Sequence, residues 1–340
     1  MHRGSGTGVA LRPRGQIRRR LRLAPAHSAA DRPTRGYGLS TSQAASVGRL
    51  IVRYSEYRPS PALASWVHRV WTLQGSAGAE RPAFQRAMPD GRPELIFNLG
   101  DSFEQLERGK TIEQPRRLIV GSTRRALQIR PTGSVNLIGI RLRPDGVAAL
   151  LRVPGRELVD RTLDLALLPR RFDQSLLDQL ADTPDVEARL KLLEWQLRLA
   201  AERATPHRRL GAAVELILRA HDPLAATQVA GAVGLSYRQL SRLFRERVGL
   251  GPKVLARITR FQGLLRALET RPDTSWSALA AETGYYDQPH LTREFRAFAA
   301  VSPQAYRAEL RELTRHFIDR GEAETPADGR FVQADSNKTR

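Results

Sequence analysis

The chain contains one short pattern twice, and this repetition limits what the C-terminal half can fold into. Residues 240–252 read LSRLFRERVGLGP, and residues 291–303 read LTREFRAFAAVSP. In both copies Leu, a hydroxyl residue, Arg and Phe occupy positions one, two, three and five, and Pro ends the stretch. A pattern repeated at a spacing of 51 residues predicts two similar supersecondary units.

The first unit, residues 225–249, has the pattern of a helix, a tight turn and a second helix. Gly234 favours the left-handed turn, because it has no Cβ to clash. Ser236 and Gln239 have the spacing of a capping box, which predicts the start of the second helix. Apolar residues recur on one face of that helix and basic residues on the other, as in a helix-turn-helix.

The second unit, residues 275–299, repeats this order. Gly284 supplies the turn and Asp287 can cap the following helix. Pro289 falls in the first turn, where the missing N–H costs little. The buried face of this helix is predicted to hold Leu291, Phe295 and Phe298.

A single helix over residues 252–270 is predicted between the two units. Its apolar residues are Leu255, Ile258, Phe261, Leu265 and Leu268, which recur every three or four positions. A rigid connector would fix the separation of the two units. If the second helices of the two units were separated by one DNA turn, ~34 Å, both would enter the major groove on one face of the duplex.

Residues 207–310 resemble the DNA-binding domain of AraC/XylS-type transcriptional regulators. The residues that carry the resemblance are Ala230, Gly234, Leu235, Ser236, Leu240, Arg242, Phe244, Gly249, Pro252, Ala280, Gly284, Gln288, His290, Thr292, Arg293, Phe295, Ser302, Pro303, Tyr306 and Arg307. The chain departs from the family pattern at Tyr285, Pro289, Leu291 and Ala300, which change packing or a turn and leave the basic positions intact. The resemblance implies a sequence-specific transcription regulator.

The outward-facing polar residues of helices 236–247 and 288–299 are the candidates for DNA contact. They are Arg238, Ser241, Arg242 and Arg245 in the first helix, and Gln288, His290, Thr292, Arg293 and Arg296 in the second. Arg can pair with guanine through two hydrogen bonds, and Gln with adenine. The alternatives are that Arg242 and Arg293 pair with an acid on a neighbouring helix, and that His290 stabilises the helix start.

The N-terminal half has the pattern of short strands followed by helices. We expect strands within residues 66–73, 93–100, 117–122, 126–131 and 135–144, which are β-favouring runs between turn signals. Helical periodicity follows, with Leu190, Leu193, Leu197 and Ala200 on one stripe. This stripe packs either on its own domain or in a dimer seam. The predicted fold class is α+β: a cupin-like barrel or sandwich with a helical extension, then an all-α tandem helix-turn-helix domain.

Regulators of the AraC type commonly carry an N-terminal cupin-like barrel that senses a small molecule or mediates dimerisation. Candidate effector-binding residues are Trp71, Glu94, Asn98 and Arg141, an aromatic wall with polar groups among strands. The alternative for each is an ordinary core or surface role. His68 is the only His between residues 28 and 206, and the chain has no Cys, so we expect no metal site, no cofactor and no enzyme activity.

The distribution of charge favours a polyanionic partner. The formal charge is +20, and residues 1–50 hold ten Arg and one acidic residue. The expected partners are double-stranded DNA and a small-molecule effector, with a homodimer and RNA polymerase also implied. The absence of Cys fits a reducing, cytoplasmic location, and no apolar run approaches the ~20 residues that span a membrane.

The expected organisation has four parts. They are a disordered basic arm (1–46), a β-rich sensor or dimerisation domain with C-terminal helices (47–204), the DNA-binding domain (205–318) and a disordered tail (319–340). Two alternative functions remain: an enzyme-like β domain tethered to DNA, and an architectural protein that binds DNA without sequence preference.

Overall fold

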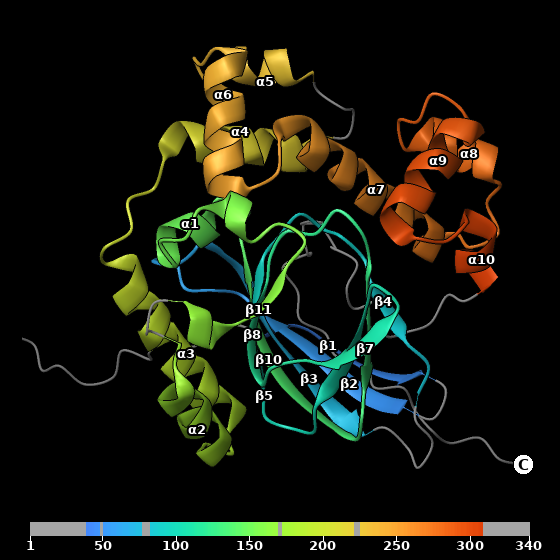
Figure 1. Ribbon diagram of the computed structural model, residues 1–340. Helices are drawn as coiled ribbons and strands as arrows, with labels where there is room; N and C mark the ends of the chain where they lie inside the picture. Colours follow the sequence, from blue (N-terminus) through green and yellow to red (C-terminus); the bar gives the residue numbers. More distant parts are fainter. Residues whose placement is uncertain (1–38, 48–49, 77–81, 169–171, 221–224, 309–340) are drawn as a thin grey trace, which may run out of the picture. The chain divides into compact units, whose positions relative to one another are not determined.

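The computed structural model describes residues 39–47, 50–76, 82–168, 172–220 and 225–308 (Figure 1). A β-rich N-terminal part is followed by a helical C-terminal part, as the sequence predicts. Within the described ranges, we find no helix with the length and hydrophobicity needed to cross a bilayer.

Two antiparallel sheets form the β-rich part. The larger sheet has the order β1 (Leu39–Val47), β2 (Leu50–Tyr57), β3 (Val67–Ser76), β10 (Ser134–Leu142), β5 (Glu94–Asn98), β8 (Arg117–Val120) and β11 (Thr162–Asp164). The smaller sheet has the order β4 (Gln85–Ala87), β9 (Leu127–Pro131), β6 (Phe103–Glu107) and β7 (Lys110–Glu113). All five predicted strands are present. The sheets do not close into one barrel, so of the two predicted architectures the sandwich is the one observed.

The last residues of the basic arm predicted over residues 1–46 form a strand. Residues 39–47 form β1, which pairs with β2 along its length. Backbone pairing with a neighbouring strand stabilises this segment although its Ser, Ala and Gln residues are weak strand formers. Residues 1–38 and the tail predicted over 319–340 lie outside the described residues.

The alternation of side chains along β5 separates two environments. Leu95 and Phe97 are fully buried on the face that packs against helices. Glu94, Ile96 and Asn98 point to the opposite face, toward the smaller sheet. Polar residues therefore lie between the two sheets because of strand periodicity.

Helices cover the outer face of the larger sheet. The elements here are α1 (Gly146–Leu150), η1 (Gly155–Glu157), η2 (Leu165–Leu167), α2 (Gln174–Asp182) and α3 (Val186–Ala201). The predicted stripe Leu190, Leu193, Leu197 and Ala200 is buried in the same core as β5. The dimer-seam interpretation of this stripe is therefore wrong, because the stripe already covers the apolar face of its own sheet.

The helical C-terminal part contains the two predicted helix-turn-helix units. Its elements are α4 (Arg208–Arg219), α5 (Ala226–Ala232), α6 (Tyr237–Leu243), the π-helical turn η3 (Phe244–Val248), α7 (Pro252–Thr270), α8 (Trp276–Glu282), α9 (Gln288–Ala299) and α10 (Pro303–Ala308). Ser236 and Gln239 form the predicted capping box, and Asp287 accepts a hydrogen bond from the His290 backbone N–H. Helix α7 has the predicted bounds, and Figure 1 shows it running between the two units.

A buried carboxylate holds α9 against α7. Glu294 on α9 is 6% exposed and binds Arg257 at 2.5 Å and Arg260 at 2.8 Å, both on α7. Arg260 also donates to the carbonyl oxygen of Gly284 and lies over the Tyr285 ring. Since Phe261 packs on Phe295 beneath this group, charged and apolar contacts both fix the second unit on the connecting helix.

We predict that Glu294→Ala lowers the free energy of unfolding by about 3 kcal/mol, because Arg260 would be left largely buried without its counter-ion. The control is Glu282→Ala, which removes an exposed pair with Arg271 and should cost less than about 1 kcal/mol. Urea unfolding of both variants measures the difference. Equal losses would contradict the role assigned to Glu294.

Candidate nucleic-acid interface and effector cavity

Three Arg side chains project from α6 and from the π-helical turn η3 that directly follows it. Arg238, Arg242 and Arg245 are exposed and line a surface hollow. Within the described part of the chain, none of the three has a side-chain hydrogen bond or an ion pair. The predicted alternative for Arg242, a pairing with an acidic neighbour, is therefore not observed.

Ser241 lies in the same hollow, but its hydroxyl does not reach the surface. The side-chain oxygen is covered by neighbouring atoms and has no hydrogen-bond partner among the residues described. The position on α6 is as expected, but a buried hydroxyl cannot touch a base edge without a rotamer change. A direct contact between Ser241 and a base stays a prediction that requires this change of rotamer.

The second unit presents a corresponding set. Gln288, Arg293 and Arg296 are exposed on α9. Neither Arg has a side-chain partner among the described residues, so the neighbouring-acid alternative is not observed for Arg293 either. Free guanidinium groups on both second helices are available to a ligand outside the protein.

His290 and Thr292 are less available. Thr292 is half-buried. The Nδ1 atom of His290 accepts from the Tyr286 backbone N–H at 3.4 Å, and its ring lies against Tyr285. Of the two alternatives for His290, these contacts favour stabilisation of the helix start.

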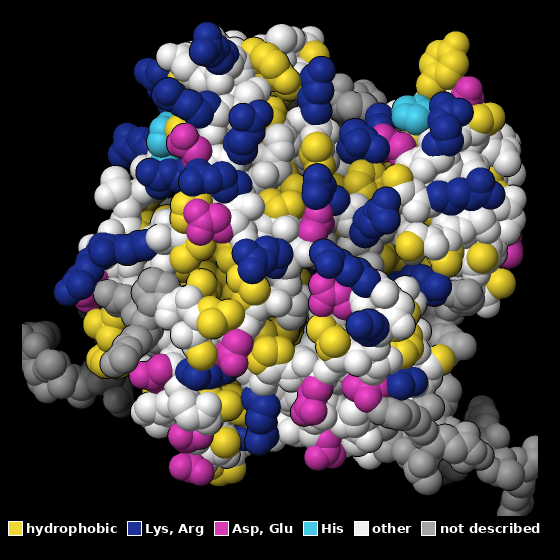
Figure 2. All heavy atoms as spheres, viewed as in Figure 1, with side chains coloured by type: hydrophobic (Ala, Val, Ile, Leu, Met, Phe, Trp, Pro, Cys, Tyr) yellow, Lys and Arg dark blue, Asp and Glu magenta, His cyan; other side chains and the backbone are white. Residues whose placement is uncertain are grey.

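Charge is unevenly spread over the face seen in Figure 2. Lys and Arg side chains gather over the part formed by the C-terminal helices, whereas most Asp and Glu side chains in this view lie over the β-rich part. Such an arrangement produces a positive potential on the side that carries α6 and α9.

Two exposed aromatic residues beside these helices were not predicted as contacts. Tyr237 is the first residue of α6 and is 42% exposed, and Tyr286 precedes the cap of α9 and is 92% exposed. The available signal was their position at the two helix starts, since Tyr237 directly follows Ser236 and Tyr286 directly precedes Asp287.

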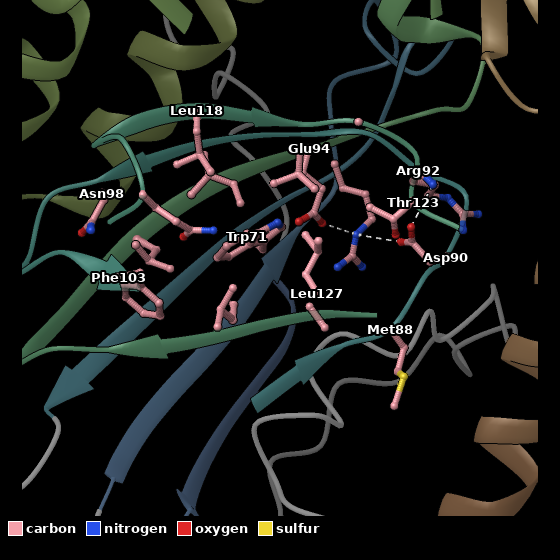
Figure 3. A pocket seen from close by; sticks show the side chains of 18 of the residues that line it. Trp71, Met88, Asp90, Arg92, Glu94, Asn98, Phe103, Leu118, Thr123 and Leu127 are labelled. Atoms are coloured by element: carbon pink, nitrogen blue, oxygen red, sulfur yellow. Dashed lines mark hydrogen bonds and ion pairs between the residues drawn. The ribbon is translucent and has the colours of Figure 1, made fainter. Parts of the chain in front are cut away.

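The four predicted effector-binding residues come together in one cavity between the two sheets. Trp71, Glu94, Asn98 and Arg141 all line it, although they come from three different strands (Figure 3). The smaller sheet contributes Phe103, Leu127 and Ile129. The cavity has a volume of about 70 Å³ and an open mouth, through which a ligand larger than this space would extend.

Arg141 is the centre of a buried charge cluster on the cavity wall. Its Nε atom donates to Glu94 at 2.6 Å, and these two residues face each other across β10 and β5. Asp90 and Glu56 lie 3.5 and 3.6 Å from the guanidinium. Desolvation lowers the pKa of Arg141, but Glu94, Tyr54, Asp90 and Glu56 together outweigh this and raise it well above its ordinary value. The guanidinium therefore stays charged.

The Trp71 ring can cover the floor of the cavity because its pairing partner on the neighbouring strand β10 is a glycine, which has no side chain to occupy that space. Gly139 pairs with Trp71 in the sheet, and a Cβ at Gly139 would lie 2.1 Å from the indole ring. The ring is 1% exposed, and its Nε1–H group has no hydrogen-bond partner among the described residues. A buried donor without a partner costs free energy, and a ligand acceptor would remove that cost.

Residues of the loop between β4 and β5 were missed as cavity residues. Met88, Asp90 and Arg92 line the cavity, and Figure 3 shows them at one end of it. The available signal for a site was the presence of two charged residues, Asp90 and Arg92, close to Glu94 in the sequence. Among the described residues, no group of three His, Asp or Glu could hold a metal ion.

Two family models match separate parts of the chain. Residues 55–164 match a domain of unknown function (DUF6597), and residues 229–309 match a helix-turn-helix domain. The second match confirms the tandem helix-turn-helix predicted from the sequence. None of the curated proteins matches the chain.

Several solved structures are similar to parts of the chain. A transcriptional regulator from Chromobacterium violaceum, described among AraC-type DNA-binding domain-containing proteins, is 27% identical, covers 30% of this chain and 91% of its own, and has a TM-score of 0.28. ToxT from Vibrio cholerae is 9% identical over 71% of this chain and 98% of its own, with a TM-score of 0.41. Another ToxT structure, from strain SCE256 with a bound unsaturated fatty acid, is 12% identical over 67% and 90%, with a TM-score of 0.39.

We predict that Gly139→Ala destabilises the protein by about 1–3 kcal/mol, because the added methyl group overpacks the site of the Trp71 ring. Gly231→Ala is the control, since a Cβ there meets no atom within 4 Å and Ala favours the helix by up to about 1 kcal/mol. Thermal unfolding of the two variants should shift in opposite directions. An unchanged Gly139→Ala midpoint would show that the indole is not held against this strand.

Proposed function

We propose that this transcriptional regulator, whose C-terminal domain is of the AraC helix-turn-helix type, places α6 and α9 in consecutive major grooves of double-stranded DNA. The observation that carries the proposal is the presence of free, exposed Arg side chains on both helices. The two units that contain these helices are joined by a single continuous helix, α7, which keeps their spacing constant.

Among the exposed residues, Arg238 and Arg242 on α6 and Gln288 and Arg293 on α9 are proposed to contact base edges. Each has the chemistry of a bidentate base contact. Arg245, in η3, and Arg296, on α9, lie about one turn beyond Arg242 and Arg293. They are proposed to contact phosphates, which orient the protein without reading sequence. Ser241, His290 and Thr292 are proposed to act only through the shape and start of the two helices.

We predict that Arg242→Ala and Arg293→Ala each weaken binding to the preferred site by about 1–3 kcal/mol and relax the preference at one base position. Selection from random DNA gives the preferred site, and fluorescence anisotropy at fixed salt gives the affinities. The control is Arg198→Ala, which removes an exposed Arg on α3 and should leave both results unchanged.

Two outcomes would contradict this assignment. An equal loss of affinity for all sequences would make both residues phosphate contacts only. A wild-type protein that selects no preferred site would favour the architectural alternative, in which charge alone supplies the affinity.

We further propose that the β-rich part regulates DNA binding through direct contacts with the helical part. Gln262 on α7 is buried and donates to the Pro89 carbonyl oxygen at 2.8 Å. Ala126, in the loop after β8, donates its backbone N–H to Phe298 at the end of α9 at 2.7 Å. Gly155 meets Gly249, which follows η3, backbone against backbone. The connecting helix and both units therefore each contact the β-rich part.

The loop over residues 88–92 is the element that links the cavity to α7. Met88 lines the cavity and also packs in the core of the helical part. Gly91, with φ of +76°, lies against Leu255 and Ile258 of α7. A ligand that changes the position of this loop would thus change the packing of the helix that separates the two DNA-contacting helices.

Coupling between two sites is reciprocal, so DNA binding should alter this loop even without an effector. We predict that DNA carrying the preferred site changes hydrogen–deuterium exchange over residues 88–92, and that Gln262→Leu abolishes this change. Residues 103–113, in β6 and β7, serve as the internal control and should not respond. A wild-type loop that exchanges identically with and without DNA would contradict the proposed regulation.

A further inference from the structure

The positive charge inside the cavity is already neutralised by the protein. Three carboxylates, Glu94, Asp90 and Glu56, lie within 3.6 Å of the Arg141 guanidinium, whose side chain is 3% exposed. Arg92, the other basic residue on the wall, is also engaged with partners. A ligand anion would find no uncompensated cation here and would lie beside Glu94 and Asp90. Burying an unpaired negative charge in such a place is unfavourable.

On its wall the cavity offers a hydrogen-bond donor and an acceptor that face the same space. The donor is Trp71 Nε1–H, which is buried without a partner. The acceptor is Glu94 Oε2: Arg141 donates to Oε1 of that carboxylate, and Oε2 accepts no hydrogen bond from any described residue. Trp71 and Glu94 lie on the two strands that flank β10, where their partners Gly139 and Arg141 are two residues apart, so both side chains point to the same face of the sheet. Figure 3 shows them close together on the wall.

The remainder of the cavity is mostly apolar. Side chains from both sheets form these walls, namely Ile96, Phe103, Leu118, Leu127, Ile129 and Leu137. Their contact with a ligand would supply affinity through the hydrophobic effect, while the donor and acceptor would fix its orientation.

We propose that the cavity binds an uncharged small molecule with an apolar, ring-sized body and a group that both accepts and donates a hydrogen bond, such as a hydroxyl. That group accepts from Trp71 Nε1–H and donates to Glu94. The site discriminates against carboxylates of the same shape. This inference rests on the proposed effector role of the cavity and specifies the class of effector.

The test compares 2-naphthol with 2-naphthoate, which share a body and differ in the charge of the polar group. Isothermal titration calorimetry of the full chain at neutral pH is expected to show at least tenfold tighter binding of 2-naphthol, which corresponds to about 1.4 kcal/mol. Equal affinities, tighter binding of 2-naphthoate, or no binding of 2-naphthol at millimolar concentration would each overturn the proposal.

Two variants test whether Glu94 and Trp71 cause the preference for 2-naphthol over 2-naphthoate. Glu94→Gln removes one negative charge from the group around Arg141, so 2-naphthoate should gain affinity and 2-naphthol should lose its advantage. Glu104→Gln is the matched control, because Glu104 binds Arg130 at the same 2.6 Å but does not line the cavity. Trp71→Phe should weaken 2-naphthol about fivefold, the value of one neutral hydrogen bond, while 2-naphthoate changes less. Unchanged selectivity in a folded Glu94→Gln protein would overturn the assignment to Glu94.

DNA binding of the same preparations separates this inference from the proposed function. Sequence-specific binding that depends on Arg293, without the preference for 2-naphthol, would refute only the ligand class. The preference for 2-naphthol in a protein that selects no DNA sequence would refute the proposed function instead. The thermal midpoint of each variant shows whether it is destabilised. If it is, the comparison of 2-naphthol with 2-naphthoate on the wild-type protein decides the proposal.

Discussion

The ion pairs of Glu294 are the interaction on which the geometry of the helical part most depends. One buried carboxylate accepts two guanidinium groups from α7, and the aromatic cluster of Phe261, Phe295 and Phe298 lies beneath it. The second unit cannot rotate about α7 without separating these charges in a poorly solvated place. The orientation of α9 relative to α7 is therefore set by electrostatics as well as by packing, and α7 in turn leads directly from the first unit.

Features that depend on local sequence could be predicted. Residue types within one turn of the chain predict the capping box at Ser236, the cap at Asp287 and both ends of α7. The structure has all of these where expected. The same holds for the five strands with strong β-favouring residues. Strand β1 was missed because pairing with β2, and not its composition, makes it a strand.

The site was only partly predictable, for a different reason. Trp71, Glu94, Asn98 and Arg141 were named from residue type, and the pleat of the sheet brings them to one face. The partners that determine their chemistry could not be named, because Asp90 and Glu56 approach Arg141 from segments with no sequence relation to β10. The same limit applies to Ser241, since the burial of a hydroxyl depends on how neighbouring helices pack.

The meeting of Gly155 and Gly249 has a consequence for how such a protein can be engineered. At each residue an added Cβ would lie 2.7 Å or less from the backbone of the other segment, and Gly249 also has a φ of +87°. Any side chain at either position would force the two backbones apart. A chimera that combines this β-rich half with the DNA-binding half of another regulator therefore has to carry both glycines across the junction. Without them, the halves could each fold and still not dock.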